Sequence, residues 1–376
     1  MISMMKIPLF KPYLGKEELS GLAKVFKSAW VGMGPRTVEF EKRFAEFVGT
    51  KEAVGVTSCT AALHIAIQGL GIRSGEVIVP PITHAATASA VMFNGATPVF
   101  ADVEEDTLCI APQDIEKKIT KRTKAIIAVH LGGHACDMDK ILKIARKYKL
   151  FVIEDCANAT GTLYKGKMAG SLGDAGCFSF EAKKNMTTGD GGMVTTNDSK
   201  LAERLRRLRF YGTNLDTWRR FQGQAHYSWR YDIAELGWKY NMNDIQAAIG
   251  LAQFKKLPWM LAQKDKLRKM YNKELLGISW LKIPREKPYT KTGWWLYIVQ
   301  VRERDKFIDF MASRGITTGV HFEPIYHHSY LKKAGVKPVT PVAERVWRHI
   351  VSLPYFPTMT KKEFRYVVDT IKKFKP

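Results

Sequence analysis

The chain has 376 residues, 45% of them hydrophobic, which is enough to bury a large core and to form one large and one smaller domain. The formal net charge of +23 favours anionic partners, but the basic residues are dispersed and form no tail or recognisable nucleic-acid module, so a nucleic-acid partner is not expected. No apolar stretch is long enough for a signal peptide or a membrane span, which makes the cytoplasm the expected location.

The cysteines are scattered along the chain, with no CxxC pair and no histidine at a zinc-ligand spacing. We therefore expect reduced thiols, neither a disulfide framework nor a metal site. The five residues are Cys59, Cys109, Cys136, Cys156 and Cys177.

Between about residue 50 and residue 200, short apolar runs alternate with longer amphipathic segments. The runs are apolar on both faces, as strands of a buried parallel sheet should be. The segments 61–71 and 138–149 carry apolar residues at helical spacing. This alternation predicts an α/β fold. The seven expected strands cover 53–58, 76–80, 97–103, 125–131, 150–155, 175–180 and 192–196.

A long helical pattern covers residues 243–275 and contains Pro258. Because proline removes a helical hydrogen bond and clashes with the preceding turn, we expect Pro258 to break or kink the helix and to mark a domain transition. The expected domains are residues 1–257, a large α/β domain with an N-terminal segment, and residues 258–376, a smaller α+β domain. The smaller domain is predicted from a strand at 294–301, a helix at 307–315 and a closing helix at 363–374.

Ligands in α/β proteins collect at the carboxyl ends of the strands, so the polar residues at these ends are candidates for a site. The first strand passes directly into a helix through Ser58, Cys59 and Thr60. Backbone N–H groups, the Thr60 hydroxyl and the positive potential of the helix N-terminus suit a phosphate there. An ordinary Ser/Thr helix cap is the alternative interpretation.

Asp155 closes the apolar strand 150–155. A carboxylate in this place could pair with a pyridinium nitrogen and keep the ring protonated, so that the ring withdraws electrons from a bound carbanion. A strand-end aspartate that caps the next helix is the alternative.

Two lysines, Lys183 and Lys184, follow the strand 175–180 and precede Thr187, Thr188 and a glycine-rich turn. Amine catalysis needs a lysine in a tight, partly desolvated place where its pKa can fall. A lysine pair on a loop is usually solvated, but the order FSF-x-x-x-K-x-x-TTG-D-GG is much less expected by chance.

His84 follows a proline-terminated strand and precedes a helix of small residues. An aromatic ring there could lie flat on a cofactor ring. A structural histidine is the alternative.

Together these residues resemble the DegT/DnrJ/EryC1/StrS family of pyridoxal 5'-phosphate (PLP)-dependent sugar aminotransferases, within the fold-type I (aspartate aminotransferase-like) superfamily. The resemblance runs over nearly the whole chain and implies a large domain with a mostly parallel seven-stranded sheet, a smaller C-terminal α+β domain, and PLP as cofactor. Matching segments include AWVGMGPRTVEFEKRFAEFVG, VIVPPITH, VIEDCANATG, FSFEAKKNMTTGDGG and LGWKYNMNDIQAAIG.

The resemblance implies roles for individual residues at the cofactor. Lys184 would carry PLP as a Schiff base, because it follows Ser179 by five positions and precedes TTGDGG. Asp155 would pair with the pyridine nitrogen, and Asn158, where the family commonly has Gln, would lie near the phenolic oxygen. His84 would stack on the ring. The positions expected at the phosphate are Ser58, Thr60, Ala61 and Ser179.

The family builds its site at a homodimer interface, where an asparagine of the partner chain completes the phosphate site. We assign this role to Asn241, although many members have Asn where Lys239 stands. Glu181 replaces a His or aromatic residue of the family, Tyr326 replaces a His, and His321 is retained. These three residues are expected on the sugar side of the site.

The implied reaction transfers an amino group from glutamate or glutamine to the keto group of a nucleotide-linked keto-deoxysugar. Amination of a keto-cyclitol, as in aminoglycoside assembly, is a close alternative. A DNA-binding regulator on the same fold is the alternative from another class, since the charge is strongly positive. Lys184, Asp155 and Ser179 favour the enzyme.

Overall fold

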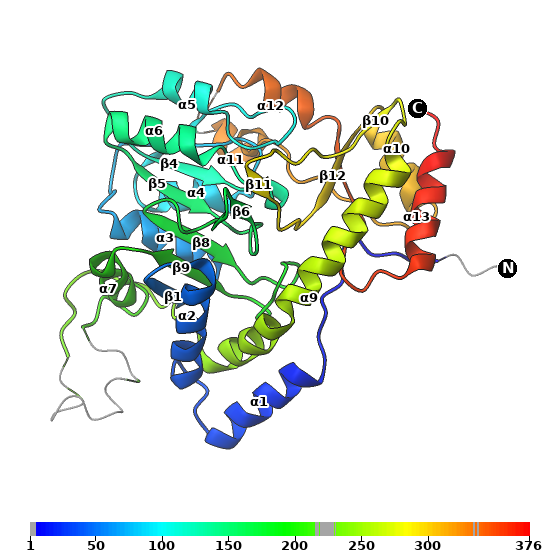
Figure 1. The fold of residues 1–376 in the computed structure, drawn as a ribbon. Helices are drawn as coiled ribbons and strands as arrows, with labels where there is room; N and C mark the ends of the chain where they lie inside the picture. Colours follow the sequence, from blue (N-terminus) through cyan, green and yellow to red (C-terminus); the bar gives the residue numbers. More distant parts are fainter. Residues whose placement is uncertain (1–4, 215–217, 219–228, 230, 334, 337) are drawn as a thin grey trace.

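The computed structural model describes residues 5–214, 218, 229, 231–333, 335–336 and 338–376. A sheet with its covering helices forms one part of the molecule, and a smaller sheet with two helices lies beside it (Figure 1). The helix α9, Asp244–Leu275, runs along both parts.

A seven-stranded sheet forms the centre of the larger part, in the order β1-β9-β8-β5-β4-β2-β3. Its pairs are parallel except for the two that β9 makes with β1 and β8. The predicted mostly parallel sheet of seven strands is confirmed. Its strands are β1 (Glu52–Val56), β2 (Glu76–Val79), β3 (Thr97–Phe100), β4 (Thr123–Val129), β5 (Phe151–Asp155), β8 (Ala175–Ser179) and β9 (Gly192–Thr196).

Helices cover the sheet because its strands are apolar on both faces. Ile78, Ile126 and Ile153 on three neighbouring strands are fully buried. The helix α3 packs against β8 and β9, and α6 packs against β5. The helices of this part are α1 (Lys16–Ser28), α2 (Pro35–Val48), α3 (Cys59–Gly69), α4 (Ala86–Phe93), α5 (Pro112–Lys118), α6 (Met138–Tyr148) and α7 (Ser199–Leu208).

The long helix α9 contains Pro258 and is not interrupted there, so the expected break is wrong. An interior proline costs a helix about 3 kcal/mol. Packing on both sides of Pro258 offsets this cost, since Leu257 and Met260 lie in a core under the first part of the helix, and Leu267 and Tyr271 lie in a second core. The domain boundary at 257/258 stays a prediction.

The second core belongs to the smaller sheet, whose order is β10-β12-β13. Tyr297, Val299 and Val301 alternate along β12 and are fully buried, which is the pattern of a strand with one face on a core. The predicted α+β arrangement is present. Its elements are β10 (Leu281–Lys282), β12 (Tyr297–Val301), α10 (Arg304–Ala312), β13 (Ile350–Leu353) and α13 (Lys361–Lys373). The short helices α11 (Ser329–Lys333) and α12 (Pro341–Val346) lie between α10 and β13 in the chain, but they pack on the core of the large sheet through Leu331, Ala343 and Val346.

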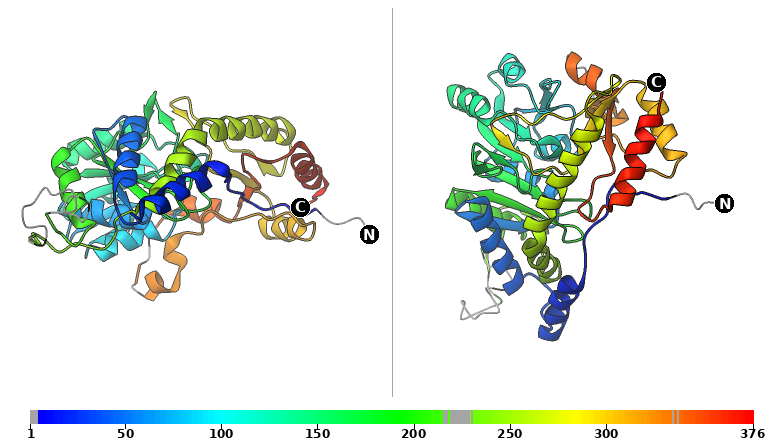
Figure 2. Two further views of the ribbon diagram at one scale, coloured as in Figure 1. Left: turned by 90° about the horizontal axis from the view of Figure 1, so that it is seen from below. Right: turned by 45° about the vertical axis from the view of Figure 1, so that its right-hand side comes forward.

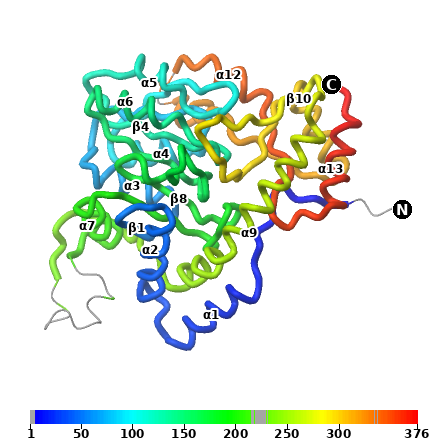
Figure 3. The backbone as a smooth tube through the Cα atoms, viewed as in Figure 1, coloured from blue at the N-terminus to red at the C-terminus, as the bar shows by residue number. Residues whose placement is uncertain are grey.

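The N-terminal segment runs past α13 before it reaches α1 (Figure 3). The Ile7 backbone N–H donates to the Gly315 carbonyl at 2.8 Å, and the Ile7 side chain lies in the second core. The first described residues and the C-terminal helix α13 therefore lie at the same end of the molecule (Figure 2).

A third sheet of two-residue strands was not expected from the sequence. It pairs β11 (Thr290–Lys291) with β6 (Leu163–Tyr164), and β6 with β7 (Lys167–Met168). Strands this short carry no readable alternation of apolar and polar residues. The sheet joins the loop after β5 to the segment before β12.

All five cysteines are free and buried. In the part of the chain that the structure describes, no helix is both long enough and apolar enough to cross a bilayer.

Candidate active site

The carboxyl ends of the central strands meet at a cavity of about 360 Å³. The residues expected at the cofactor and substrate come together here with three exceptions, Ala61, Asn241 and Tyr326. Those that line the cavity are Ser58, Thr60, His84, Asp155, Asn158, Ser179, Glu181, Lys184 and His321.

Lys184 lies on the loop between β8 and β9, and its side chain is half-buried. Its Nζ atom lies 3.6 Å from the centre of the Trp295 ring. Burial lowers the pKa of Lys184 to about 8, although Cys59 and Asp155 act in the opposite direction. A lysine in such a place has a substantial neutral fraction near neutral pH, as a nucleophile requires. The neighbouring Lys183 is exposed.

Asp155 ends β5 and is buried. Its Oδ2 accepts a hydrogen bond from the Thr87 hydroxyl at 2.9 Å, and its Oδ1 accepts one from the Ala157 backbone N–H at 3.1 Å. Burial raises the pKa of this carboxyl, and these hydrogen bonds and the Lys184 charge act against that rise. The carboxylate faces the cavity at a fixed position.

Ser58 is the N-cap of α3, and its hydroxyl accepts a hydrogen bond from the Ala61 backbone N–H at 3.1 Å. The helix-cap interpretation therefore holds for Ser58, while Thr60 also lines the cavity. A side chain at Gly192 on β9 would meet the Ser58 backbone at 2.5 Å, so the glycine lets the strand pass close to the start of α3. Ala61 is buried and contributes to the helix N-terminus instead of the lining.

His84 is exposed at the cavity, and its ring centre lies 5.9 Å from that of Phe322. Asn158 is buried, and its Oδ1 accepts a hydrogen bond from the Gly132 backbone N–H at 3.3 Å. One ring face and one side-chain amide thus border the space between Asp155 and Lys184.

Glu181 and His321 also line the cavity. Burial and the nearby charges of Lys184 and Lys183 lower the pKa of His321 to about 4, so its imidazole is neutral at pH 7. Tyr326 does not line the cavity. Its hydroxyl is bonded to Thr340 at 2.6 Å and to Glu344 at 2.7 Å, in a buried place under α12.

Asn241 also lies outside this cavity. Its backbone pairs with Val56 of β1, and its Nδ2 donates to the Met242 carbonyl at 3.4 Å. The side-chain Oδ1 is buried and has no hydrogen-bond partner among the residues that the structure describes. The Nζ atom of Lys239 lies over the Phe210 ring at 4.1 Å.

Three residues of the site were not identified from the sequence: Trp295 under the Lys184 amine, Thr87 on Asp155, and Phe322 beside His84. Trp295 stands in the WWLYIVQV run, which carries only the signal of a strand. Thr87 lies in a helix of small residues, and its hydroxyl was the one available signal.

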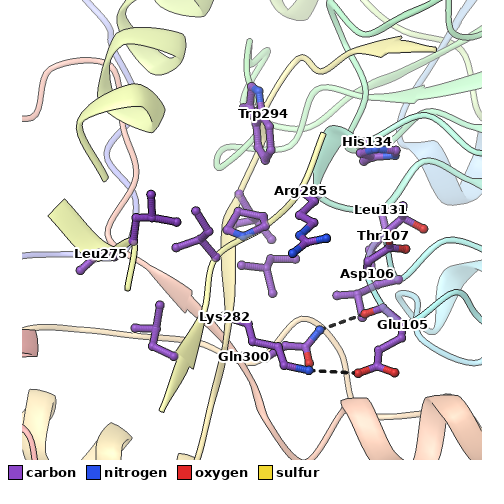
Figure 4. Close-up of a pocket in the computed structure, with 18 of the residues that line it drawn as sticks. Glu105, Asp106, Thr107, Leu131, His134, Leu275, Lys282, Arg285, Trp294 and Gln300 are labelled. Carbon is purple, nitrogen blue, oxygen red and sulfur yellow. Dashed lines mark hydrogen bonds and ion pairs between the residues drawn. The ribbon is translucent and has the colours of Figure 1, made fainter. Parts of the chain in front are cut away.

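A larger cavity, of about 590 Å³, lies between the loop after β3 and the segment around β10 (Figure 4). It contains Trp294 and His134 at one side and the ion pair of Lys282 and Glu105, 3.2 Å apart, at the other. It lacks a lysine of lowered pKa and a strand-end carboxylate. The volume of a cavity therefore does not identify the active site here. The chemistry of the residues that line the smaller cavity does.

One group of buried side chains has the residue types of a metal site. The ligand atoms of His130, Glu154 and Cys156 lie within 4.8 Å of one another. However, the His130 Nδ1 accepts a hydrogen bond from the Cys136 backbone N–H, so its Nε2 carries the proton and donates to Glu154 at 3.0 Å. Both ring nitrogens are thereby occupied.

The donor set of the smaller cavity fits the chemical groups of PLP. It offers an amine of low pKa in Lys184, a buried carboxylate in Asp155 and an open ring face in His84. The hydroxyl groups of Thr60 and Ser179 lie at the cavity together with the N-terminus of α3. An aldehyde, a pyridine nitrogen, a flat ring and a phosphate each find a suitable partner.

Comparison with known proteins agrees with this chemistry. The model of the DegT/DnrJ/EryC1/StrS aminotransferase family matches residues 12–372. The chain is 43% identical to the uncharacterised protein MJ1066 of Methanocaldococcus jannaschii, over 98% of this chain and 97% of that one. It is 41% identical to the spore coat polysaccharide biosynthesis protein SpsC of Bacillus subtilis, over 97% and 96% of the two chains.

The fold is also similar to that of Spr1654 from Streptococcus pneumoniae, a protein assigned as a sugar aminotransferase. The structure of its PMP form matches with a TM-score of 0.92 and 29% identity over 98% of both chains. The same protein has been solved in a PLP form. The present chain thus belongs to the DegT/DnrJ/EryC1/StrS aminotransferase family and is an aminotransferase that uses PLP.

Proposed function

We propose that this enzyme works in the cytoplasm and transfers an amino group from glutamate or glutamine to the keto group of a nucleotide-linked keto-deoxysugar. The observation that carries the catalytic part is the Lys184 amine, held in the cavity with its pKa lowered to about 8. The sugar part rests on the relatives, which include a polysaccharide biosynthesis protein and a protein assigned as a sugar aminotransferase.

Lys184 is the residue to which the cofactor is covalently linked in this proposal. With a pKa of about 8, roughly a tenth of the free amine is neutral at pH 7, compared with a very small fraction of an ordinary lysine. Once freed by the amino donor, the same amine takes a proton from the donor carbon and returns it at the other end of the reacting system. The bound cofactor supplies an electron sink for this proton transfer.

Asp155, His84 and the start of α3 hold the cofactor in the orientation that Lys184 requires. The Asp155 carboxylate would pair with the ring nitrogen, and its bonds to Thr87 and Ala157 fix its position. The His84 ring would stack on the cofactor ring, and Asn158 would lie near the phenolic oxygen. The Thr60 and Ser179 hydroxyl groups would bind the phosphate at the N-terminus of α3, where Ser58 caps the helix by accepting from the Ala61 backbone N–H.

Glu181 and His321 face the acceptor sugar in this proposal. The His321 imidazole, neutral at pH 7, donates or accepts hydrogen bonds without adding a charge. Glu181 lines the cavity beside it and offers acceptors for sugar hydroxyl groups. The dispersed positive charge of +23 would help to attract a diphosphate-linked substrate from solution.

We also propose that two copies of the chain form a homodimer with shared sites. Asn241 lies outside its own cavity, and its buried Oδ1 has no hydrogen-bond partner in the described part of the chain, which supports its assignment to the site of the partner chain. Large apolar side chains are also exposed on the surface, with Phe93 and Ile233 each 61% exposed and Leu236 74% exposed. Water-exposed groups of this size favour burial against a second chain.

The test is to load the enzyme as the pyridoxamine phosphate form and to offer it a panel of acceptors. The panel contains nucleotide-linked keto-deoxysugars, keto-cyclitols and α-keto acids, and the visible spectrum reports return of the cofactor to its aldehyde state. We expect return with a nucleotide-linked keto-sugar. Return with keto-cyclitols alone would support the cyclitol alternative, and return with α-keto acids alone would contradict the sugar assignment.

A further inference from the structure

A second lysine with a lowered pKa lies close to the active site. Lys264 is on α9 and its side chain is 1% exposed. Burial lowers its pKa to about 7. No carboxylate lies within ion-pair distance of it among the residues that the structure describes. A buried lysine without an acidic partner is costly to the fold, so its contacts require an explanation.

The Lys264 amine donates two hydrogen bonds, and both acceptors belong to residues next to the active site. One bond reaches the Asn185 Oδ1 at 2.8 Å, and the other reaches the Trp295 carbonyl at 3.1 Å. The remaining side of the amine faces the Tyr355 ring, whose centre is 4.9 Å away. A neutral amine has two N–H donors, so these two acceptors satisfy it, and the ring also accommodates a third proton.

Both hydrogen-bond partners of Lys264 act directly on the position of Lys184. Asn185 follows Lys184 in the chain, and its Nδ2 donates to the carbonyls of Thr160 at 3.1 Å and Gly293 at 2.8 Å. Asn185 therefore fixes the end of the loop that carries Lys184.

Trp295 holds Lys184 from the other side. Its ring lies 3.6 Å from the Lys184 Nζ, and its indole N–H donates to the Lys183 carbonyl at 2.8 Å. Lys264 thus closes a ring of contacts that runs through Asn185, Lys184 and Trp295. Lys184 and Lys264 also line the same void of about 10 Å³, which leaves no room for more than one water molecule between them.

We propose that Lys264 is a positioning residue of the cofactor site, which holds Asn185 and Trp295 in place and thereby keeps the Lys184 amine out of water. This inference rests on the proposed role of Lys184. Its physical basis is that burial is the main cause of the low Lys184 pKa, and the Trp295 ring provides part of that burial. Loss of the Lys264 donors frees the Trp295 segment and admits water to the Lys184 amine.

The charged groups around Lys184 influence the pH at which its nitrogen gains or loses a proton. Besides burial, the groups that act on its proton affinity lie at the end of β5, at the start of α3, on the loops after β8 and β2, and on the segment before β13. They are Cys59, Asp155, Glu181, Lys183, His84 and His321. Lys264 is itself a titratable amine near Lys184, so the variants must separate the loss of its N–H donors from the loss of its charge.

The experiment is a pH titration of the visible absorption of the full-length holoenzyme, in which the spectrum changes as the nitrogen of Lys184 gains or loses a proton. In Lys264→Met the midpoint is expected to rise by about one pH unit relative to the wild type, because the site becomes more hydrated. Lys264→Gln keeps N–H donors without a charge and is expected to show the wild-type midpoint, whereas a rise equal to that of Lys264→Met would mean that only the lost charge matters and would overturn the inference. Lys266→Met, at an exposed position of the same helix, is the matched control and leaves the midpoint unchanged.

A wild-type midpoint in folded Lys264→Met would overturn the inference and leave Lys264 as a buried packing residue. If Lys264→Met does not fold, Tyr355→Phe decides, since it removes only the hydroxyl that donates to the Lys264 carbonyl. A rise of the titration midpoint in Tyr355→Phe, smaller than the rise expected for Lys264→Met, supports the inference. An unchanged midpoint contradicts it. Borohydride reduction and peptide mapping of the wild type separate the two proposals: cofactor on Lys184 without a shift overturns the inference alone, and cofactor on another residue overturns both.

Discussion

The two sides of the active-site cavity are built differently. The side proposed to hold the cofactor includes residues at or just after the ends of β1, β5 and β8, and the parallel neighbours β5 and β8 fix the spacing of Asp155 and Ser179. The side proposed to face the substrate includes Glu181 and His321, which lie on loops.

This difference determines which residues of the cavity have fixed positions and which depend on local contacts. A strand end inherits the position of its backbone from hydrogen bonds along the whole sheet, so the Asp155 side chain needs only the local bonds from Thr87 and Ala157 to be fixed. A loop residue depends on local contacts, as His321 does on its bond to the Ser352 hydroxyl at 2.9 Å. We expect substitutions on the cofactor side to affect every substrate, and those on the substrate side to affect particular sugars.

The largest expected effect is that of Lys184→Ala. Loss of the catalytic amine should lower the transamination rate by about 10²- to 10⁴-fold, the usual range for removal of a general acid-base group. Steady-state kinetics of the purified variant measures this. Lys183→Ala is the matched control, because Lys183 is exposed and should change the rate much less. Equal losses of transamination rate in the two variants would contradict the assignment of the catalytic role to Lys184 alone.

Asp155→Asn is expected to have the next largest effect. The amide keeps the size of the side chain but loses the charge that pairs with the ring nitrogen, which should cost about 10- to 100-fold in rate with every acceptor. Thr87→Val removes one hydrogen bond to Asp155 and should lower the rate less. A loss in Asp155→Asn confined to one acceptor sugar would place Asp155 on the substrate side.

A third prediction concerns stability, because the cofactor side is supported by the buried Lys264. Its pKa is about 7 in the folded protein and about 10.5 in the unfolded chain. Between these values the unfolded chain binds more protons, so the free energy of unfolding should rise with pH by up to about 1.4 kcal/mol per unit. Urea unfolding at pH 7 and pH 9 should show this rise in the wild type, and a smaller one in Lys264→Met. An identical pH dependence in the two proteins would exclude a lowered pKa for Lys264.

The smallest effect on activity is expected for Tyr326→Phe. The Tyr326 hydroxyl is bonded to Thr340 and Glu344, away from the cavity, so its loss should cost about 1 kcal/mol of stability. The ratio kcat/KM for the acceptor should change by less than about twofold, because Thr340 and Glu344, which each lose a hydrogen bond, do not line the cavity. Thermal unfolding and kinetics measure the two effects. A large loss of kcat/KM with unchanged stability would return Tyr326 to the substrate side.

The same difference between strand ends and loops determines how much of the fold and of the site could be predicted from the sequence alone. All seven strands of the central sheet were expected within a few residues, because their apolar runs are continuous, and Ser58, Asp155 and Ser179 followed as strand ends. Trp295 and Thr87 were missed because a hydrophobic residue in the run predicted as a strand and a threonine in a helix have no distinct local signal; Trp295 in fact lies just before β12. The break expected at Pro258 is absent because packing on both sides of it outweighs the local cost of a proline. The place of Tyr326 depends on α12, which folds against it from a later part of the chain.

The most direct test of the role of Lys184 is to reduce the holoenzyme with borohydride and map the labelled peptide. We expect a yellow protein whose cofactor becomes fixed to Lys184, in a peptide that also contains the neighbouring Lys183 as an unmodified residue. Label on Lys183 or Lys264, or a protein that stays colourless after addition of PLP, would contradict this role.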